Sequence, residues 1–390
     1  MLTVMAFLVV TGETTPFGLI REIAVGLHAT DDQVGLAVGG YAFVAGLSSV
    51  PLAHWTSRLD RRAILAASLL VFGGGHLAAA AAGHIAVFAA ARAIAALGHG
   101  LLFAVAVPTA IRLAEPAVQG RAGARVMVGS ATALVAGTPL ATYLGQAAGW
   151  RTTLVVLAAA ALLLAGAALR LLPAVTGRER RDGGPSLFTV VRRPDLVIVL
   201  TTTLTISTAH FVAFTFLAPY AAGRLDVRGT GLAVLLLVYG AAAVAASTVA
   251  GRIVDRHPRT GTAVSAATFT LALTGIWLTA ALHLPTLGVP LVVVWGAAFA
   301  ALAVLTSLIA LRHATGAHTE TVNAVSGIAF QLGVVAGSAA GSLAVAADHL
   351  TSLPLVAASG GFLVLAAVLL GGHAFPPTTP TTSIREPELP

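Results

Sequence analysis

Long apolar runs recur along the sequence, and they restrict the fold more than any other feature. A helix needs roughly 20 apolar residues to cross about 30 Å of hydrocarbon, and runs of that order follow one another through most of the chain. Charged residues make up only 9% of the 390 positions, against roughly a quarter in soluble domains, so no water-soluble surface can be built. Strands crossing lipid would show short alternating segments instead. The sequence therefore predicts an all-α membrane protein.

Twelve membrane spans are expected, and one long polar stretch divides them six and six. The stretch runs from about Thr176 to Asp195 and contains GRERRDGGP, which has nothing to bury. It predicts a bundle over 1–172, a cytoplasmic linker over 173–195, a second bundle over 196–372 and a disordered cytoplasmic tail over 373–390. The expected spans are 4–20, 34–54, 63–82, 86–111, 126–146, 152–172, 196–218, 230–250, 261–283, 288–311, 322–346 and 353–371.

The arginines predict how the chain is oriented. The protein has no lysine, and with the N-terminus inside, 17 of its 22 arginines fall in the cytoplasmic segments. The opposite side holds only Arg21, Arg151, Arg224 and Arg228. This asymmetry predicts a multi-pass protein of the bacterial inner membrane with both termini in the cytoplasm. Because the basic residues do not form one stripe, the net charge of +7 does not indicate nucleic-acid binding.

The two halves of the sequence resemble each other. A shift of 198 residues superposes polar residues at matching points of both halves: Tyr41 on Tyr239, Ser49 on Ser247, Arg58 on Arg256 and Arg61 on Arg259. This offset predicts two pseudo-symmetric six-helix bundles. Duplicated halves that rock against each other around a central site are typical of secondary transporters.

The residue inventory argues against an enzyme. There is no cysteine, and none of the twelve histidines has zinc-ligand spacing, so we expect neither a metal nor a cofactor. Paired acids and a nucleophile constellation are lacking too. The sequence has no Walker-type loop and no lysine to complete one, so ATP hydrolysis by this chain is not expected and an ion gradient must supply the energy.

Five segments carry a family resemblance. They are TGETTPFGL (Thr11 to Leu19), ARAIAALGHG (Ala91 to Gly100), a stretch of the fifth span in which Thr138 separates Gly137 from Pro139, and the loops SRLDRRAIL (Ser57 to Leu65) and GRIVDRHPR (Gly251 to Arg259). Together they resemble the major facilitator superfamily, and within it the drug:proton antiporter branch of arabinose, nucleoside and chloramphenicol exporters. The resemblance implies the fold of that superfamily, a monomer, and export rather than uptake.

The resemblance also assigns roles to the loops and to the fifth span. It implies gating residues in the two arginine-rich loops: Arg58, Arg61, Arg62, Gly251, Asp255, Arg256 and Arg259. We hypothesise that Asp255 and Arg256 pair across the contact between the halves and stabilise one access state. The alternative is that the arginines only anchor the chain at the cytoplasmic face. Gly137 and Pro139 are expected to permit a kink and a close helix approach, with ordinary packing as the alternative.

Glu13 is the candidate proton carrier. It is the carboxylate predicted to lie deep inside a span, about nine residues or roughly 14 Å from the cytoplasmic end of its helix. An ionised carboxylate there costs several kcal/mol unless it is paired, hydrated or protonated. Such a group can gain and lose a proton as its surroundings change, which is what a coupling site requires. A substrate contact and a plain hydrogen bond to a neighbouring helix are the alternatives.

Four other polar side chains are candidates for the central cavity. Arg92 and His99 are seven residues apart on one helix face, and Glu13 lies between them in depth, so the three are expected to form a cluster. His210 and Gln331 supply polar atoms in the second half. The alternatives are an Arg92 that reaches the outer headgroups, a His99 bonded to a backbone carbonyl, and packing hydrogen bonds for the other two.

The leading hypothesis is a proton-coupled secondary transporter that exports a small amphipathic compound, such as an antibiotic, by antiport. The first alternative is efflux of a sugar or nucleoside-type metabolite by the same fold, which predicts more hydrogen-bonding side chains around the cavity. A different alternative is a membrane receptor or scaffold that transports nothing, for which Glu13 and Arg92 would serve no purpose. The expected partners are a small-molecule substrate, protons and the lipid bilayer.

Overall fold

Every regular element in the described part of the chain is helical. The computed structural model describes residues 1–115, 118–174, 193–313 and 319–375. The first half consists of α1 (Leu2–Gly26), α2 (Asp31–Trp55), α3 (Arg61–Ala80), α4 (Ile85–Leu113), α5 (Gln119–Thr132), η2 (Ala133–Gly137), α6 (Thr138–Ala148) and α7 (Trp150–Leu171). The second half consists of α9 (Pro194–Phe214), α10 (Leu217–Arg224), α11 (Thr230–Arg256), α12 (Pro258–Ala281), α13 (Pro285–Arg312), α14 (Thr319–Ala346), η4 (Leu350–Ser352), α15 (Leu353–Leu370) and η5 (Gly372–Ala374).

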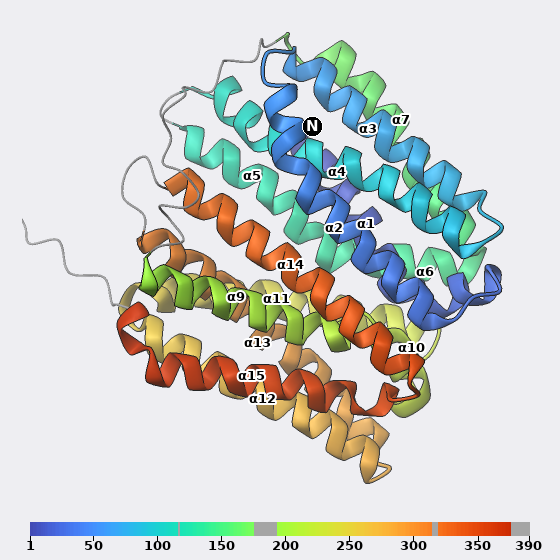
Figure 1. Ribbon diagram of the computed structural model, residues 1–390. Helices are drawn as coiled ribbons and strands as arrows, with labels where there is room; N and C mark the ends of the chain where they lie inside the picture. Colours follow the sequence, from blue (N-terminus) through green and yellow to red (C-terminus); the bar gives the residue numbers. More distant parts are fainter. Residues whose placement is uncertain (116–117, 175–192, 314–318, 376–390) are drawn as a thin grey trace, which may run out of the picture.

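These elements form twelve spans in two bundles of six. Figure 1 shows the first half, in blue to green, above the second half, in yellow-green to red. Eleven helical stretches in the described residues are long and apolar enough to cross a membrane. The helix outside that set is α2, which has 25 residues and packs between α4 and α14. The twelve-helix fold is therefore confirmed, while most of the predicted linker and tail lies outside the described residues.

Local sequence signals set where the helices begin. Thr30 and Gln33 form a capping box at the start of α2, and the Asp60 carboxylate accepts a hydrogen bond from the Arg62 backbone at the start of α3. Proline stands in the first turn of α9, α12 and α13, where a missing backbone donor costs nothing. Gly149, with φ of 91°, makes the sharp turn between α6 and α7.

Two of the predicted spans are interrupted. The fifth consists of α5, the π-helical segment η2 and α6, so its path changes directly before Pro139. The seventh changes direction at Thr215 and Phe216 between α9 and α10. The sequence predicts a kink at Gly137 and Pro139 in the fifth span, 126–146, but no break in the seventh span, 196–218. In the fifth span, Pro139 cannot donate the backbone hydrogen bond that would continue a regular helix.

The two halves meet mainly through three sets of helices. These are α2 with α14, η2 and α6 with α11, and α1 with α10. Small residues allow the close approach: a Cβ added to Gly39 would lie 3.3 Å from Ser338, and one added to Gly240 would lie 2.6 Å from the Val135 backbone. Because α6 and α10 belong to the end opposite the N-terminus, these contacts lie toward that end. Beyond Gly46, α2 exposes Leu47 and Trp55 near the N-terminal end.

Candidate functional site

Pro16 shapes α1 around the candidate site. A proline inside a helix has no backbone N–H, and its ring crowds the carbonyl four residues earlier, here that of Gly12. Leu19, three residues later, departs from helical geometry with φ of −128° and ψ of 17°. The Gly12 carbonyl therefore lacks its usual intrahelical donor in the middle of a membrane span. It is available to a side chain from another helix.

Arg92 on α4 supplies that donor. Its side chain is fully buried, and Nη1 donates to the Gly12 carbonyl at 2.7 Å while Nη2 donates to the Glu13 carbonyl at 3.1 Å. The guanidinium also lies 4.1 Å from the centre of the Tyr41 ring, a cation–π contact. Arg92 thus binds the backbone of the proline-containing turn, and the alternative of reaching the outer headgroups does not hold.

His76 on α3 completes the shell around Arg92. Its Nδ1 lies 2.9 Å from the Phe72 carbonyl, which can only accept, so Nδ1 carries the proton. The unprotonated Nε2 then accepts from Arg92 Nη1 at 3.3 Å. Gly12 makes this approach possible, because a Cβ there would lie 2.8 Å from His76 Nε2. The fully buried His76 therefore helps to hold the guanidinium in place.

His99 links Glu13 to α2. Its Nδ1 lies 2.9 Å from the Tyr41 hydroxyl, and its Nε2 lies 3.9 Å from Glu13 Oε2. If the Tyr41 hydroxyl donates to Nδ1, Nε2 carries the proton and points toward the carboxylate. His99 was expected either to join the cluster or to bond a backbone carbonyl, and the structure places it in the cluster.

Glu13 stands at the boundary between the halves. Its side chain is 20% exposed although it lies in the middle of α1, and it forms a hydrogen bond with the side chain of Gln331 on α14. Gln331 reaches it across a close contact, since a Cβ on Gly46 of α2 would lie 3.3 Å from Gln331 Cβ. The carboxylate thus touches His99 in its own half and Gln331 in the other.

The predicted cluster of Glu13, Arg92 and His99 is present in the structure, with a difference in pairing. Arg92 binds the backbone of residues 12 and 13, whereas His99 Nε2 is the group that faces the carboxylate, at 3.9 Å. Tyr41 and His76 belong to the same cluster, although neither was predicted from the sequence to have a role there. His76 could have been found, because an ionisable side chain within a membrane span is by default a functional candidate.

The family model of the major facilitator superfamily matches residues 2–338. The chain belongs to this superfamily. Two curated relatives, each named as a chloramphenicol efflux pump, come from Mycobacterium tuberculosis strains CDC 1551 / Oshkosh and ATCC 25618 / H37Rv. Each is 34% identical to this superfamily member, over 352 and 354 residues, and each alignment covers 87% of this chain and 83% of the relative.

Solved structures of the same fold agree. A point mutant of the nucleoside transporter NupG superposes with a TM-score of 0.77 at 12% identity over 95% of this chain and 98% of its own. A bacterial homologue of the human lysosomal transporter Spinster, described as inward-facing and occupied, gives 0.78 at 15% identity over 96% of both chains. A D-xylose–proton symporter gives 0.70 at 15% identity, over 94% of this chain and 95% of its own.

The arginine-rich loops of this superfamily member bind helix ends within each half. Arg62 donates to the Leu169 carbonyl at the end of α7, at 3.5 Å, and Arg259 donates to the Leu369 carbonyl at the end of α15, at 2.7 Å. A cation there complements the negative end of the helix dipole. The two halves therefore make similar contacts, although the 198-residue offset matches Arg259 with Arg61 and not with Arg62.

One contact of Asp255 lies within the second half. Its carboxylate accepts from Arg312 Nη2 at 2.8 Å, and both residues belong to the second half. Arg61 donates to the Ser57 carbonyl at 3.1 Å, in its own loop. These contacts lie within single halves, and the gating role of all seven loop residues, together with the pairing of Asp255 and Arg256 across the halves, stays a prediction.

His210 and Gln331 lie in different surroundings. Gln331 binds Glu13, whereas His210 is buried and stacks 3.5 Å from Phe299, ring centre to ring centre, inside the second half. Within the described residues, no group of three or more His, Cys, Asp or Glu side chains could hold a metal ion.

Gly137 on η2 permits a close approach between α1 and the fifth span. A Cβ at this position would lie 2.0 Å from Thr11 Oγ1, and nearby the Thr14 and Thr138 hydroxyls share a hydrogen bond of 2.7 Å. We expect Gly137→Ala to destabilise the fold by about 1–3 kcal/mol, because the added methyl overpacks this contact. Thermal unfolding in detergent measures it. Gly166→Ala, with no atom within 4 Å of the added Cβ, is the matched control and should unfold at or slightly above the parent temperature.

Pro16 should affect the transport rate because it leaves the Gly12 carbonyl available to Arg92. In a Pro16→Ala variant the new N–H can donate to Gly12, which then competes with Arg92 for the same acceptor. We expect a folded protein whose initial transport rate falls about three- to tenfold, the worth of one such hydrogen bond. Pro108→Ala, which changes an internal proline of α4, is the control. Transport by Pro16→Ala at the parent rate would contradict this role.

Proposed function

We propose that this chain exports a small amphipathic aromatic compound, of which chloramphenicol is the first candidate, in exchange for protons. The observation that carries the proposal is Glu13: a carboxylate in the middle of the membrane that is hydrogen-bonded to Gln331 across the two halves. The names of the two Mycobacterium tuberculosis relatives support the choice of substrate.

Glu13 would couple the two fluxes through its charge. The ionised carboxylate accepts a hydrogen bond from the Gln331 amide and faces His99 Nε2 at 3.9 Å. Protonation removes the negative charge and leaves Arg92, held by two carbonyls and His76, as the fixed cation of the site. Because one of the contacts of Glu13 is to the other half, its protonation changes the balance between access states. Tyr41 and His99 would orient the carboxyl group.

The proposed orientation places both termini in the cytoplasm, following the arginine distribution. The contacts between the halves described above would then lie toward the external side, and the conformation would be open to the cytoplasm. Moving one proton through 100 mV is worth about 2.3 kcal/mol, which is equivalent to roughly a 50-fold concentration gradient of a neutral compound. Since each chain contains both halves, we propose that a monomer is sufficient.

The site favours a flat aromatic compound over a sugar-like metabolite. A sugar needs many hydrogen-bonding side chains, whereas the helices beside Gln331 contribute mainly phenylalanine rings: Phe17, Phe211, Phe214, Phe299 and Phe330. The fold of the nucleoside and xylose transporters is shared but carries no substrate information at 12% and 15% identity.

Reconstituted vesicles test the proposal. With a pH-sensitive dye trapped inside, adding chloramphenicol should trigger proton movement that a protonophore abolishes, and an imposed pH gradient should drive radiolabelled chloramphenicol uphill. Nucleosides and sugars tested in parallel should give neither signal. Proton movement with a sugar or nucleoside but not with chloramphenicol would replace the proposed substrate class. A lack of coupled transport with every compound would overturn the antiporter proposal.

A further inference from the structure

The second half contains a cluster of aromatic rings beside the candidate site. We name it the C-half aromatic cluster and define it by seven residues of α9, α11, α13 and α14: His210, Phe211, Phe214, Tyr239, Trp295, Phe299 and Phe330. Phe17 of α1 joins it from the other half, 5.1 Å from Phe214 between ring centres. The cluster therefore reaches from the interior of the second half to the boundary between the halves.

Three polar atoms within this cluster are buried without a hydrogen-bond partner. They are His210 Nδ1, the Tyr239 hydroxyl and Trp295 Nε1. The three rings contact one another, with centre-to-centre distances of 5.1 Å from His210 to Trp295 and 6.0 Å from Tyr239 to Trp295. Buried polar atoms almost always have a hydrogen-bond partner, so three neighbouring side chains with unsatisfied polar atoms require an explanation. The indole N–H can only donate and the phenol can donate, so the missing partner carries a hydrogen-bond acceptor.

Phe299 separates these atoms from the candidate site. Its ring lies face to face with His210, with 3.5 Å between centres and 5° between planes. Aromatic rings prefer offset or edge-on contacts to this arrangement, so Phe299 is not held there by its best geometry. Phe299 is only half-buried and contacts Phe330, the neighbour of Gln331. A route from Glu13 to His210 thus passes through Gln331, Phe330 and Phe299.

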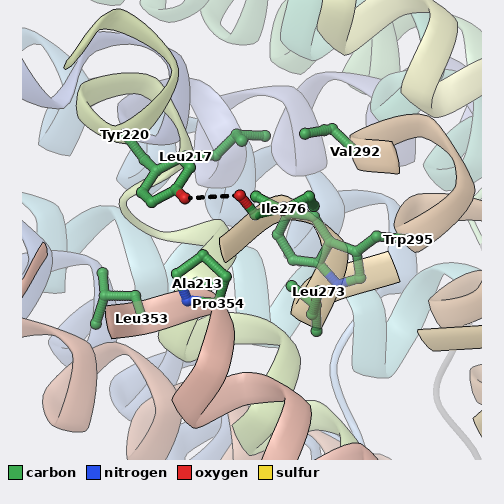
Figure 2. Close-up of a pocket in the computed structure, with 9 residues that line it drawn as sticks. All are labelled: Ala213, Leu217, Tyr220, Leu273, Ile276, Val292, Trp295, Leu353 and Pro354. Carbon is green, nitrogen blue, oxygen red and sulfur yellow. Dashed lines mark hydrogen bonds between the residues drawn. The ribbon is translucent and has the colours of Figure 1, made fainter. Parts of the chain in front are cut away.

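Trp295 has a packing gap on another side of its ring. A cavity of about 10 Å³, near the minimum size for one water molecule, is lined by Trp295, Tyr220, Ile276 and six apolar residues. Figure 2 shows this cavity, with the Tyr220 hydroxyl turned to the Ile276 carbonyl at 3.3 Å. The indole can therefore shift slightly without displacing well-packed neighbours, whereas Tyr220 already has its partner.

We propose that His210, Tyr239 and Trp295 form a specificity subsite for a planar aromatic group that bears a hydrogen-bond acceptor. The Phe299 ring moves aside, the flat group of the exported compound takes its place on the His210 face, and the acceptor comes within reach of the Trp295 and Tyr239 donors. This inference rests on the proposed function and names the residues that select its substrate. It predicts that an acceptor on the ring, such as a nitro group, is recognised in the second half.

Equilibrium binding to the purified full-length protein in detergent tests the subsite. The probes are chloramphenicol, which has a nitrophenyl ring, and its analogue with hydrogen in place of the nitro group. Tyr239→Phe and Trp295→Phe each remove a donor and keep an aromatic ring, and thermal unfolding checks that both variants fold. Tyr220→Phe and Trp277→Phe are the matched controls in the same half, with Tyr220 on α10 and Trp277 on α12. We expect Tyr239→Phe and Trp295→Phe to bind chloramphenicol about three- to tenfold more weakly, with the nitro-free analogue and the controls within about twofold of the parent.

Three results would overturn the subsite. The first is chloramphenicol binding at the parent affinity by both variants, and the second is a parent protein that binds neither probe. The third is an equal loss of affinity for both probes, which indicates a general packing change around buried water. The assay uses no proton gradient, so it is independent of coupling. If the parent protein binds chloramphenicol more tightly than the nitro-free analogue but moves no protons, the proposed antiport is contradicted and the subsite is still supported.

Discussion

A Glu13→Gln variant should bind chloramphenicol but lose all proton-coupled movement of it. Glutamine keeps the size of the side chain and its hydrogen bond to Gln331, yet it cannot take up or release a proton in this range of pH. We expect dye-reported proton movement and gradient-driven accumulation in vesicles to fall to the level of protein-free vesicles. Binding should also lose its pH dependence, because the balance between access states no longer depends on the protonation of this carboxylate.

Glu22→Gln provides the matched control for this experiment. Glu22 lies on the same helix, near its C-terminal end. It lines a cavity of about 420 Å³ together with Arg21, Asp31 and Arg228. This variant should couple protons to transport as the parent does. Proton coupling by Glu13→Gln at the parent level would remove the carboxylate from the mechanism, and a coupling defect in Glu22→Gln of equal size would show that any lost charge on α1 has this effect.

Arg92→Met should be the most destabilising of the site variants and should not transport. Methionine fills much of the volume but leaves the Gly12 carbonyl and His76 Nε2 without a donor inside the membrane, and the Glu13 carbonyl loses one of its donors. We expect a loss of about 2–4 kcal/mol in the free energy of unfolding, the sum of two or three unsatisfied buried groups at the modest values found in membrane proteins. Arg92→Lys should rescue little, because one ammonium group cannot reproduce the planar fork and its stacking on Tyr41.

Arg151→Met is the control that distinguishes the effect of burial from the effect of losing two hydrogen bonds. Arg151 also donates to two backbone carbonyls, those of Gly26 and Ala82, but its side chain is exposed at the end of the bundle. Water can replace it there, so we expect a loss below about 1 kcal/mol and near-parent transport. Chemical denaturation in detergent and vesicle uptake measure both variants. Equal stability losses would show that burial does not decide the importance of Arg92.

The sequence predicted some of the residues that form the candidate site but not how they pair. Glu13, Arg92 and His99 could be grouped because helical periodicity fixes depth and face within a span. The pairing could not be foreseen, because it depends on Pro16 freeing a carbonyl of α1 at the height where α4 presents Arg92. Tyr41 was missed as a site residue for the same reason, since its role comes from contacts with Arg92 and His99 on a helix distant in the sequence. His76 lies within a predicted span and could have been singled out, but its contact with Arg92 could not.

The sequence by itself determined that this protein is a twelve-helix membrane protein in two related halves, because the cost of burying polar groups in lipid leaves a chain of such composition no other fold. It also determined which side chains are too costly to lie in the membrane without a purpose. Only the tertiary structure decided which of them meet. The distances of 3.9 Å from Glu13 to His99 and 2.7 Å from Arg92 to Gly12, and the separate burial of His210, follow from how helices pack side by side, which no periodicity along a single helix encodes.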